Sequence, residues 1–515
     1  MKKHIDIFDS ILREGTQSGD ELSLEERLAV ARLLRDLGVN VIEAGFPGSN
    51  ELNFETVRRI GREVEGITVC ALARIHDADI DAALRSLEGA AQPRVHVFIA
   101  TSDIHINKKL RMTRSEVLGR SALAVKRIRE HCDNIEFSAE DATRSDWDYL
   151  VEIFSAVIEA GATVINVPDT VGYTYPTKYK ELIRYLRART RGAEKVTWSV
   201  HCHNDLGMAV ANSLEGVRAG ASQVEGCFWG RGERAGNAQL EPVIMAIHIR
   251  QDLFPHRSTS IRTEKLWPTC QEIARLIGCL TPDRYPIIGE TAWTHSSGIH
   301  DDGVRKARET YEIMTPSLVG WRGARRKLIA EMGGSGLAEA ITEIGYPGDE
   351  IADVILQQYK RLASAKGVLL SDDLHMLVRE YYMEQGNRGK HHFTVDPDRI
   401  EYRSGAFGVV TLSQNGTSYE TSSTGDGPID ALVRAINIAL EKHGVDISEL
   451  RFEKMQFVQG AGGSEANAWV VVYATLGERT CCARSAHTDT VKAAALAYLR
   501  AVNNLLFSPI VNQGN

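Results

Sequence analysis

Hydrophobic and polar positions alternate along the first half of the chain in a regular succession of two patterns. Short runs rich in β-branched residues, typical of buried strands, are separated by longer segments whose apolar residues recur at helical spacing. The strand-like runs are residues 4–10, 39–46, 67–73, 94–101, 134–141, 163–170, 197–204 and 222–228. This succession predicts a (β/α)₈ barrel over residues 1–275, with a doubly wound open sheet as the competing fold.

The second half of the chain follows a different pattern. Residues 250–288 have helical character and residues 337–383 resemble a pair of amphipathic helices, so small helical linker subdomains are expected over 276–388. Residues 389–515 alternate strands and helices. The predicted strands include 408–412, 452–458 and 469–474, and the predicted helices are 429–442 and 490–502. This pattern predicts a C-terminal α+β domain.

Composition and charge exclude several classes of protein. The 515 residues are 43% hydrophobic and 25% charged, as in ordinary globular proteins, and the net charge of −8 argues against binding to nucleic acid or an anionic membrane. We find no signal-peptide pattern at the N-terminus and no apolar stretch long enough to span a bilayer. The eight cysteines are scattered, which fits reduced thiols. The sequence therefore predicts a cytoplasmic protein.

Two histidines at the end of the seventh predicted strand carry the strongest chemical signal. An apolar run over 196–200 is followed by His201, Cys202 and His203. Because side chains on a strand alternate between its faces, the two imidazoles point the same way and Cys202 points to the opposite face. Paired imidazoles are good metal ligands, although an isolated His-x-His is more often two ordinary polar side chains.

Ionisable and polar side chains also occupy the ends of other predicted strands, and the carboxyl ends of barrel strands are where active sites lie. They are Arg13, Glu14, Glu43, Arg74, His96, Glu136, Ser138, Glu140, Asp169 and Thr170. A glycine-rich loop, 230–237, follows the eighth strand. Such a loop can present backbone N–H groups to a phosphate, or Asn237 could supply an oxygen ligand near the histidines.

A carboxylate from strand one and two imidazoles from strand seven would form a mixed nitrogen and oxygen site. Such a site suits Zn²⁺, Mn²⁺ or Mg²⁺ acting as a Lewis acid on a carbonyl substrate, and the ligand set does not choose among the three metals. Arg13, beside Glu14, is placed to stabilise an oxyanion or enolate.

The chain resembles the acyl-CoA/2-oxo-acid condensing enzymes, the family of the 2-isopropylmalate and homocitrate synthases. The matching segments are 9–17, 42–47, 136–141, 166–173, 201–213, 232–237, 296–300, 308–314 and 425–431. The resemblance covers essentially the whole chain and is greatest to the bacterial leucine-pathway enzyme. It implies a Claisen-type condensation of acetyl-CoA with a 2-oxo acid, 2-oxoisovalerate being favoured, followed by thioester hydrolysis to 2-isopropylmalate and CoA.

The resemblance also implies a role for each matching residue. Glu14, His201 and His203 would bind the divalent metal, with Asn237 nearby or as a further ligand, and Arg13 would polarise the ketone of the oxo acid. The predicted substrate-binding residues are Gln17, Gly48, His96, Ser138, Thr170 and Trp229, with Thr170 holding the carboxylate. Acetyl-CoA would be the co-substrate, and its predicted binding residues are Gly232, Glu233 and Arg234.

Catalysis would need a base to remove a methyl proton from acetyl-CoA. The resemblance implies His300 as that base, oriented by Glu140 and supported by Tyr311. Because His300 lies beyond the barrel, a neighbouring segment or a partner subunit would have to deliver it, so a homodimer is expected. The C-terminal domain resembles the family's regulatory and dimerisation domain, which implies an amino-acid effector that the sequence does not identify.

Departures from the family pattern leave the substrate open. Glu14 stands where the leucine-pathway enzymes usually have Asp, and Gly48 and Trp229 replace residues of different size. These differences fit neutral drift in an isopropylmalate synthase, or a relative that takes a bulkier oxo acid, such as phenylpyruvate to benzylmalate. Homocitrate synthase is a further alternative within the family. A metal-dependent acyl-CoA lyase or aldolase, and a silent amino-acid sensor, are the non-condensing alternatives.

Overall fold

The computed structural model describes the chain except for residues 1–2, 16–21, 280, 283, 290, 294–299, 301–302, 305, 322–331, 367–368, 370, 385–391, 404–405, 459–467, 478 and 507–515. The chain divides into two compact units. The first contains residues 1–293 and 312–323, and the second contains residues 294–311 and 324–515.

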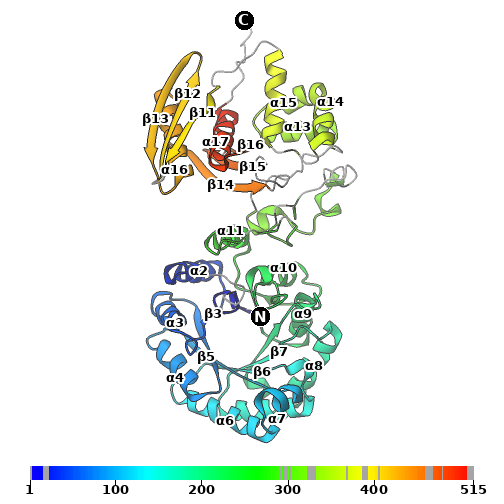
Figure 1. Ribbon diagram of the computed structural model, residues 1–515. Coiled ribbons are helices and arrows are strands. Elements are labelled where there is room, and N and C mark those ends of the chain that lie inside the picture. Colours follow the sequence, from blue (N-terminus) through cyan, green and yellow to red (C-terminus); the bar gives the residue numbers. More distant parts are fainter. Residues whose placement is uncertain are drawn as a thin grey trace. The chain divides into compact units, whose positions relative to one another are not determined.

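The first unit is a closed barrel of eight parallel strands (Figure 1). The strands are β2 (Asp6–Asp9), β3 (Val41–Gly45), β4 (Thr68–Arg74), β5 (Pro93–Ala100), β6 (Ile135–Glu140), β7 (Val164–Asp169), β8 (Thr197–Cys202) and β9 (Gln223–Gly226). Closure is made by β2, which pairs with both β3 and β9. This arrangement confirms the predicted (β/α)₈ fold, and the open sheet is excluded.

Helices surround the strands of this barrel (Figure 1). They are α1 (Ile11–Glu14), α2 (Leu24–Leu37), α3 (Glu51–Glu63), α4 (Asp77–Ser86), α5 (Asp103–His105), α6 (Arg114–Arg129), α7 (Trp147–Ala160), α8 (Pro176–Arg189), α9 (Ala209–Ala219), α10 (Leu240–Ile249) and α11 (Leu266–Leu276). Local sequence sets their ends. Ser23 and Glu26 form a capping box at the start of α2, and Gly38 ends that helix with φ +99°.

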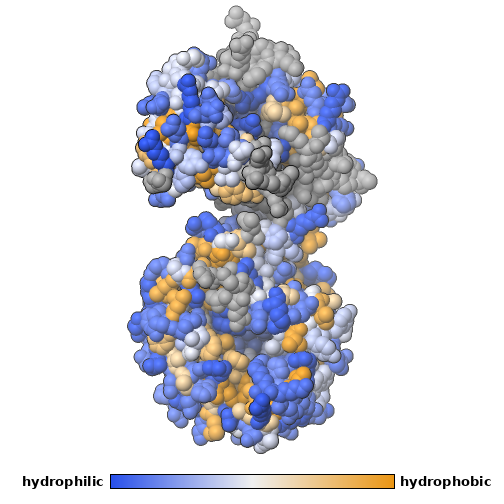
Figure 2. Space-filling model, viewed as in Figure 1, coloured by the Kyte–Doolittle hydropathy of each residue, from blue (hydrophilic) through white to orange (hydrophobic). Residues whose placement is uncertain are grey.

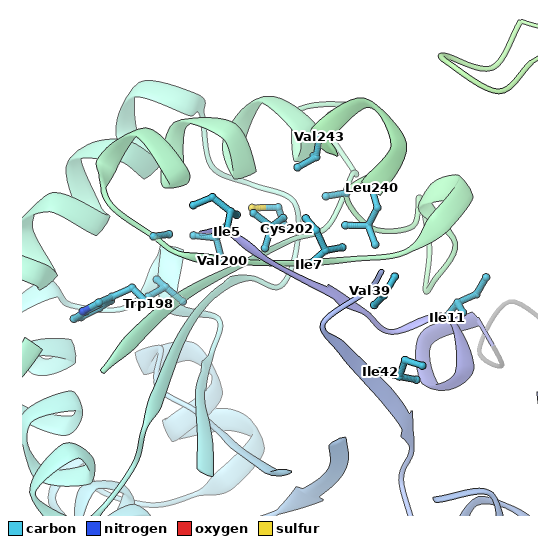
Figure 3. Packing of buried hydrophobic residues seen from close by; sticks show 14 of the residues in the cluster. Ile5, Ile7, Ile11, Val39, Ile42, Trp198, Val200, Cys202, Leu240 and Val243 are labelled. Carbon is cyan, nitrogen blue, oxygen red and sulfur yellow. The ribbon is translucent and has the colours of Figure 1, made fainter. Parts of the chain in front are cut away.

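The outer face of β8 packs against the surrounding helices, and this packing decides where His201 points. In Figure 3, Cys202 near the end of β8 lies nearer to Leu240 and Val243 of α10 than Val200 does, and Trp198 lies further along the strand, away from α10. All five side chains are buried in the main hydrophobic core. Because alternate residues face opposite sides, Ser199 and His201 face the barrel interior.

The segment between α10 and α11 differs from the helical expectation for residues 250–288. It contains a two-residue strand, β10 (Arg257–Ser258), that pairs in parallel with β1 (Lys3–His4). Helix α10 ends at Ile249, and Pro255 lies between it and β10. A proline lacks the N–H that helix continuation requires, so the chain turns back here toward the start of the first barrel strand.

Within the described residues from 332 to 384, the second unit has three linker helices, and the α+β domain follows them. The helices are α13 (Gly334–Glu343), α14 (Gly348–Lys366) and α15 (Ser371–Glu384). The predicted helical pair over 337–383 was wrong in number, because Gly345 adopts φ +93° and Pro347 follows it, which ends one helix before the next begins. The helices pack around a small core that includes Leu337, Ile355 and Leu374.

The C-terminal domain contains two antiparallel sheets of three strands each. The first has β11 (Thr394–Arg403), β12 (Phe407–Gln414) and β13 (Thr417–Thr424), and the second has β14 (Leu450–Val458), β15 (Ala468–Leu476) and β16 (Arg479–His487). Helices α16 (Pro428–Lys442) and α17 (Thr490–Leu506) contribute much of the shared core. The predicted α+β class is confirmed.

The outer surface of the protein is predominantly hydrophilic in the view of Figure 2. Among the described residues, none of the helices is both long and apolar enough to cross a bilayer.

Candidate active site

Three predicted metal ligands meet at the carboxyl end of the barrel. Glu14 lies on α1, directly after β2, and His201 lies on β8. His203 is one residue beyond β8, where a single antiparallel bridge joins it to Asn237. One ligand atom each from Glu14, His201 and His203 lies within 4.8 Å of the others. The bridge explains how Asn237, distant in sequence, is brought to the same place.

Several buried atoms of this cluster have no hydrogen-bond partner. They are Glu14 Oε2, His203 Nδ1 and Asn237 Oδ1. The amide nitrogen of Asn237 donates to the carbonyl oxygen of Arg231 at 2.9 Å, which leaves the amide oxygen as the unpaired atom. Buried polar atoms are rarely left unpaired because their desolvation costs free energy. Their convergence fits a bound cation.

The charge states of the cluster suit a metal. Burial lowers the pKa of both His201 and His203 to about 4, so the imidazoles are neutral and have free lone pairs at neutral pH. Burial acts to raise the pKa of Glu14, but the adjacent Arg13 guanidinium, together with His201 and His203, outweighs burial and holds this pKa below its usual value. Neutral nitrogens and an ionised carboxylate are the forms that bind a divalent cation.

Arg13 begins a chain of hydrogen bonds that crosses the barrel interior. Its guanidinium pairs with Glu14 and donates to Glu43 at 2.5 Å. Glu43 also contacts His96 Nδ1 at 2.7 Å, and His96 Nε2 lies 2.6 Å from the Ser138 hydroxyl. His96 and Ser138, both predicted to bind substrate, are thereby fixed in orientation at the bottom of the site.

Glu225 is a site residue that the sequence analysis missed. It lies on β9, fully inside the barrel, and its Oε2 is 3.3 Å from His201 Nδ1. Its two oxygens also accept hydrogen bonds from Ser199 Oγ at 2.6 Å and Asn166 Nδ2 at 3.0 Å. The alternation of polar Gln223 and Glu225 in the predicted strand 222–228 was the available signal.

Thr170 and Arg234 lie together at the rim. The Thr170 hydroxyl accepts a hydrogen bond from the Asp141 backbone N–H at 2.9 Å. Arg234 donates to the Thr170 carbonyl at 2.8 Å and binds both oxygens of Asp205. Arg234, Gly232 and their neighbours in the 230–236 loop line a pocket of about 500 Å³. Glu233, also in this loop, lies 3.8 Å from Arg234.

Trp229 and Gly48 have close packing contacts of their own. The Trp229 indole is buried and donates to Thr281 at 3.0 Å, and its backbone N–H donates to Glu241 at 2.9 Å. A Cβ built on Gly48 would lie 2.8 Å from Asp79 Oδ1. These contacts give a structural reason for a tryptophan at position 229 and a glycine at position 48. The predicted effect of both residues on the size of the substrate stays a prediction.

The predicted base, His300, and the carboxylate expected to orient it, Glu140, belong to different units. Glu140, on β6 of the barrel, pairs with Lys109 at 2.7 Å and lies 3.5 Å from His105. His300 and Tyr311 belong to the second unit, where their rings stack with centroids 4.1 Å apart. The predicted pairing of Glu140 with His300 therefore stays a prediction, and Gln17 lies outside the described residues.

Comparison with known proteins finds family matches along almost the whole chain. The HMGL-like family matches residues 4–273, the homocitrate synthase post-HMGL domain-like family matches 287–367, and the LeuA allosteric (dimerisation) domain matches 369–506. A 2-isopropylmalate synthase of Pyrococcus furiosus is 43% identical over 98% of this chain and 100% of its own length. The chain belongs to the 2-isopropylmalate synthase family.

Two further relatives have the same name and similar coverage. The 2-isopropylmalate synthases of Pelotomaculum thermopropionicum and Nitrosococcus oceani are each 41% identical over 98% of this chain, and cover 99% and 98% of their own lengths. The resemblance inferred from the sequence is confirmed. Within this 2-isopropylmalate synthase family member, the cluster of Glu14, His201 and His203 lies in the part of the chain that the HMGL-like family matches.

Proposed function

We propose that the protein condenses acetyl-CoA with a 2-oxo acid, 2-oxoisovalerate being favoured, and hydrolyses the thioester to release 2-isopropylmalate and CoA. The observation that carries this proposal is the convergence of Glu14, His201, His203 and Asn237 with three unpaired buried atoms. Relatives named 2-isopropylmalate synthase that match almost the entire chain support the same reaction.

Residues at different positions in the site would have different roles in this reaction. Glu14, His201 and His203 would hold a divalent cation, Mn²⁺, Mg²⁺ or Zn²⁺, and Asn237 Oδ1 is the further oxygen available to it. When bound, the cation supplies Lewis acidity to the ketone of the oxo acid. Arg13 stays cationic because Glu14 and Glu43 hold its pKa above the usual value, although burial opposes this. Its guanidinium can stabilise the developing alkoxide.

Two further residues would bind the reactants at the rim. Thr170 would hold the carboxylate of the oxo acid, since its hydroxyl retains its own proton for donation while accepting from the Asp141 N–H. The 230–236 loop, with Arg234 anchored on Asp205, would receive phosphates of acetyl-CoA.

Proton removal from the acetyl methyl group is assigned to His300. Glu140 would orient its imidazole, and Tyr311 supports the ring by stacking on it. An enolate formed in this way attacks the ketone carbon, and water then cleaves the thioester. A base and an oxyanion stabiliser on separate segments are the two components that such a condensation requires.

We further propose a cytoplasmic homodimer with an amino-acid effector bound by the C-terminal domain. The match to the LeuA allosteric (dimerisation) domain over residues 369–506 supports the dimer and the effector. Equilibrium sedimentation tests the dimer. Inhibition by a panel of amino acids, leucine included, tests the effector, and a loss of inhibition on deleting the C-terminal domain would locate its site.

The reaction is tested by measuring CoA release from acetyl-CoA with a panel of oxo acids. The panel contains 2-oxoisovalerate, phenylpyruvate, 2-oxoglutarate, pyruvate and 2-oxobutyrate, each with Mn²⁺, Mg²⁺ or Zn²⁺. The highest kcat/KM is expected with 2-oxoisovalerate. A preference for phenylpyruvate would identify a benzylmalate-forming relative, and a preference for 2-oxoglutarate a homocitrate synthase. No release with any acid would overturn the condensation.

A further inference from the structure

A second cavity lies at the opposite end of the barrel from the candidate active site. It has a volume of about 560 Å³, and six of its lining residues are Lys3, Lys180, Arg184, Arg218, His256 and Arg257. Lys3 precedes β2, and Arg218 lies near the end of α9, just before β9. Both positions belong to the amino-terminal face of the strands, whereas His201 and His203 lie at the carboxyl-terminal face.

The fold brings these cations together from four elements of the first unit, β1, α8, α9 and β10. Lys180 and Arg184 lie one turn apart on α8, which packs beside α9 (Figure 1). Lys3 and Arg257 are direct neighbours in the parallel pair of β1 and β10. Like charges at adjacent positions of a sheet repel each other, so this pairing costs free energy unless an anion lies between them.

Three of the five Lys and Arg side chains of the cavity have no carboxylate partner among the described residues. Glu215 pairs with Lys180 at 2.6 Å and with Arg218. Within the part of the chain that the structure describes, Lys3, Arg184 and Arg257 form no ion pair with a carboxylate. Burial is the main reason that the pKa of Arg257 lies below its usual value, and the nearby Arg187 lowers it further. This concentration contrasts with the net charge of −8 of the whole chain.

His256 gives the cavity an ordered wall. It adopts a left-handed conformation with φ +59°, which is unfavourable for a residue with a side chain. Its carbonyl accepts a hydrogen bond from the Lys3 backbone N–H at 2.6 Å, and this bond holds the turn against β1. Backbone pairing therefore holds this turn of the cavity wall in place.

We propose that this cavity binds a soluble polyphosphate anion of nucleotide size. Guanidinium groups bind phosphate oxygens in pairs, and three of the cations are arginines. The volume falls within the range of small-molecule sites, about 300–1,000 Å³. This site is separate from the proposed catalytic reaction and does not depend on it.

Titration calorimetry with tripolyphosphate and ATP on the full-length protein tests the proposal. Wild type should bind one anion per chain. The double variant Arg184→Ala/Arg257→Ala should bind about tenfold more weakly for each arginine removed, because charge-assisted hydrogen bonds are lost. The control Lys178→Ala/Arg189→Ala removes the same number of positive charges, both from positions of α8 outside this cavity. This variant should bind the anion as tightly as wild type does.

The two ligands distinguish the sources of the polyphosphate. Tighter binding of ATP identifies a nucleotide site, and tighter binding of tripolyphosphate identifies an inorganic polyphosphate site; adenosine should not bind. No binding by wild type at millimolar concentration overturns the proposal. Unchanged binding in the arginine double variant also overturns it, because the anion would then occupy another place, such as the 230–236 loop. Arg184→Glu, at an exposed position of α8, repeats the test if the double variant does not fold.

Discussion

Glu225 Oε2 lies 3.3 Å from His201 Nδ1, and this contact sets the orientation of one predicted metal ligand. With Nδ1 engaged by the carboxylate, the Nε2 lone pair of the same ring is free to face the Glu14 cluster. Ser199 and Asn166 both donate to Glu225, and Glu136 is a further hydrogen-bond partner, so the carboxyl group is held in place beside the imidazole.

Glu225→Gln should weaken metal binding about 10–100-fold, the usual effect of changing the outer partner of a ligating histidine. The amide nitrogen of Gln would have to face Ser199, Asn166 or His201, which already present donors. Competition titration with a chromophoric chelator measures the affinity. Glu181→Gln, on the exposed surface of α8, is the matched control and should bind metal normally. An unchanged affinity in Glu225→Gln would contradict the positioning role.

His203→Ala removes a predicted ligand whose Nδ1 has no hydrogen-bond partner. Metal affinity should fall by more than about 100-fold, because loss of a ligand exceeds loss of its outer partner. CoA release should fall in parallel and recover partly at high metal concentration. Elemental analysis of the purified protein gives the metal content. His131→Ala, at an exposed position after α6, is the control, and full turnover by His203→Ala would exclude the metal assignment.

The sequence predicted the barrel strands well because each is a local pattern. The runs 163–170 and 197–204 contain β7 and β8, since β-branched residues alternate there and glycine or polar turns bound them. It also predicted Glu14, His201, His203 and Asn237 as one group. The His203–Asn237 bridge that brings the last two together was not predictable, because it depends on the path of the loop between them.

Other parts could not be read from the chain because they depend on distant contacts. Glu225 lies in the middle of an otherwise ordinary strand, and only the closed barrel shows that it meets His201 and Asn166. The parallel pairing of Lys3 with Arg257 likewise joins two residues that lie far apart in the sequence. The periodicity of apolar residues indicates which face of a helix or strand is buried. It does not indicate which residue of another element contacts that face.

Gly48→Ala tests whether this glycine enlarges the substrate pocket. A Cβ would lie 2.8 Å from Asp79 Oδ1, and Asp79 is held by Arg74 at 2.5 Å. We expect destabilisation of about 1–3 kcal/mol from overpacking, with the ratio of kcat/KM for 2-oxoisovalerate and phenylpyruvate changed less than about twofold. Thermal unfolding and the two kinetic assays measure these effects.

The control for Gly48→Ala is Gly119→Ala. Gly119 lies within α6, and a Cβ there would meet nothing within 4 Å, so the variant should be slightly stabilised by its better helix propensity. A tenfold or larger shift in the substrate ratio of Gly48→Ala alone would instead support the pocket role, since it equals about 1.4 kcal/mol of discrimination.

Glu241 gives the barrel a pH-dependent stability. It is fully buried on α10 and accepts hydrogen bonds from Trp229 N at 2.9 Å and Tyr285 Oη at 3.4 Å. Burial raises its pKa to about 8, whereas the unfolded chain ionises it near pH 4.3. Between these values the folded state binds the additional proton, so its contribution to stability falls as pH rises and levels off above about pH 8.

Glu241→Gln removes this titration while keeping the shape and one acceptor oxygen. The free energy of unfolding of the variant relative to wild type should therefore increase from pH 5 to pH 8, by at most about 1.4 kcal/mol per pH unit. Calorimetric unfolding across this range measures the difference. Glu272→Gln is the control, because the Arg275 hydrogen bond lowers the pKa of Glu272 and its titration lies below this window. A relative stability of Glu241→Gln that stays constant from pH 5 to pH 8 would mean that Glu241 is already ionised in the folded protein.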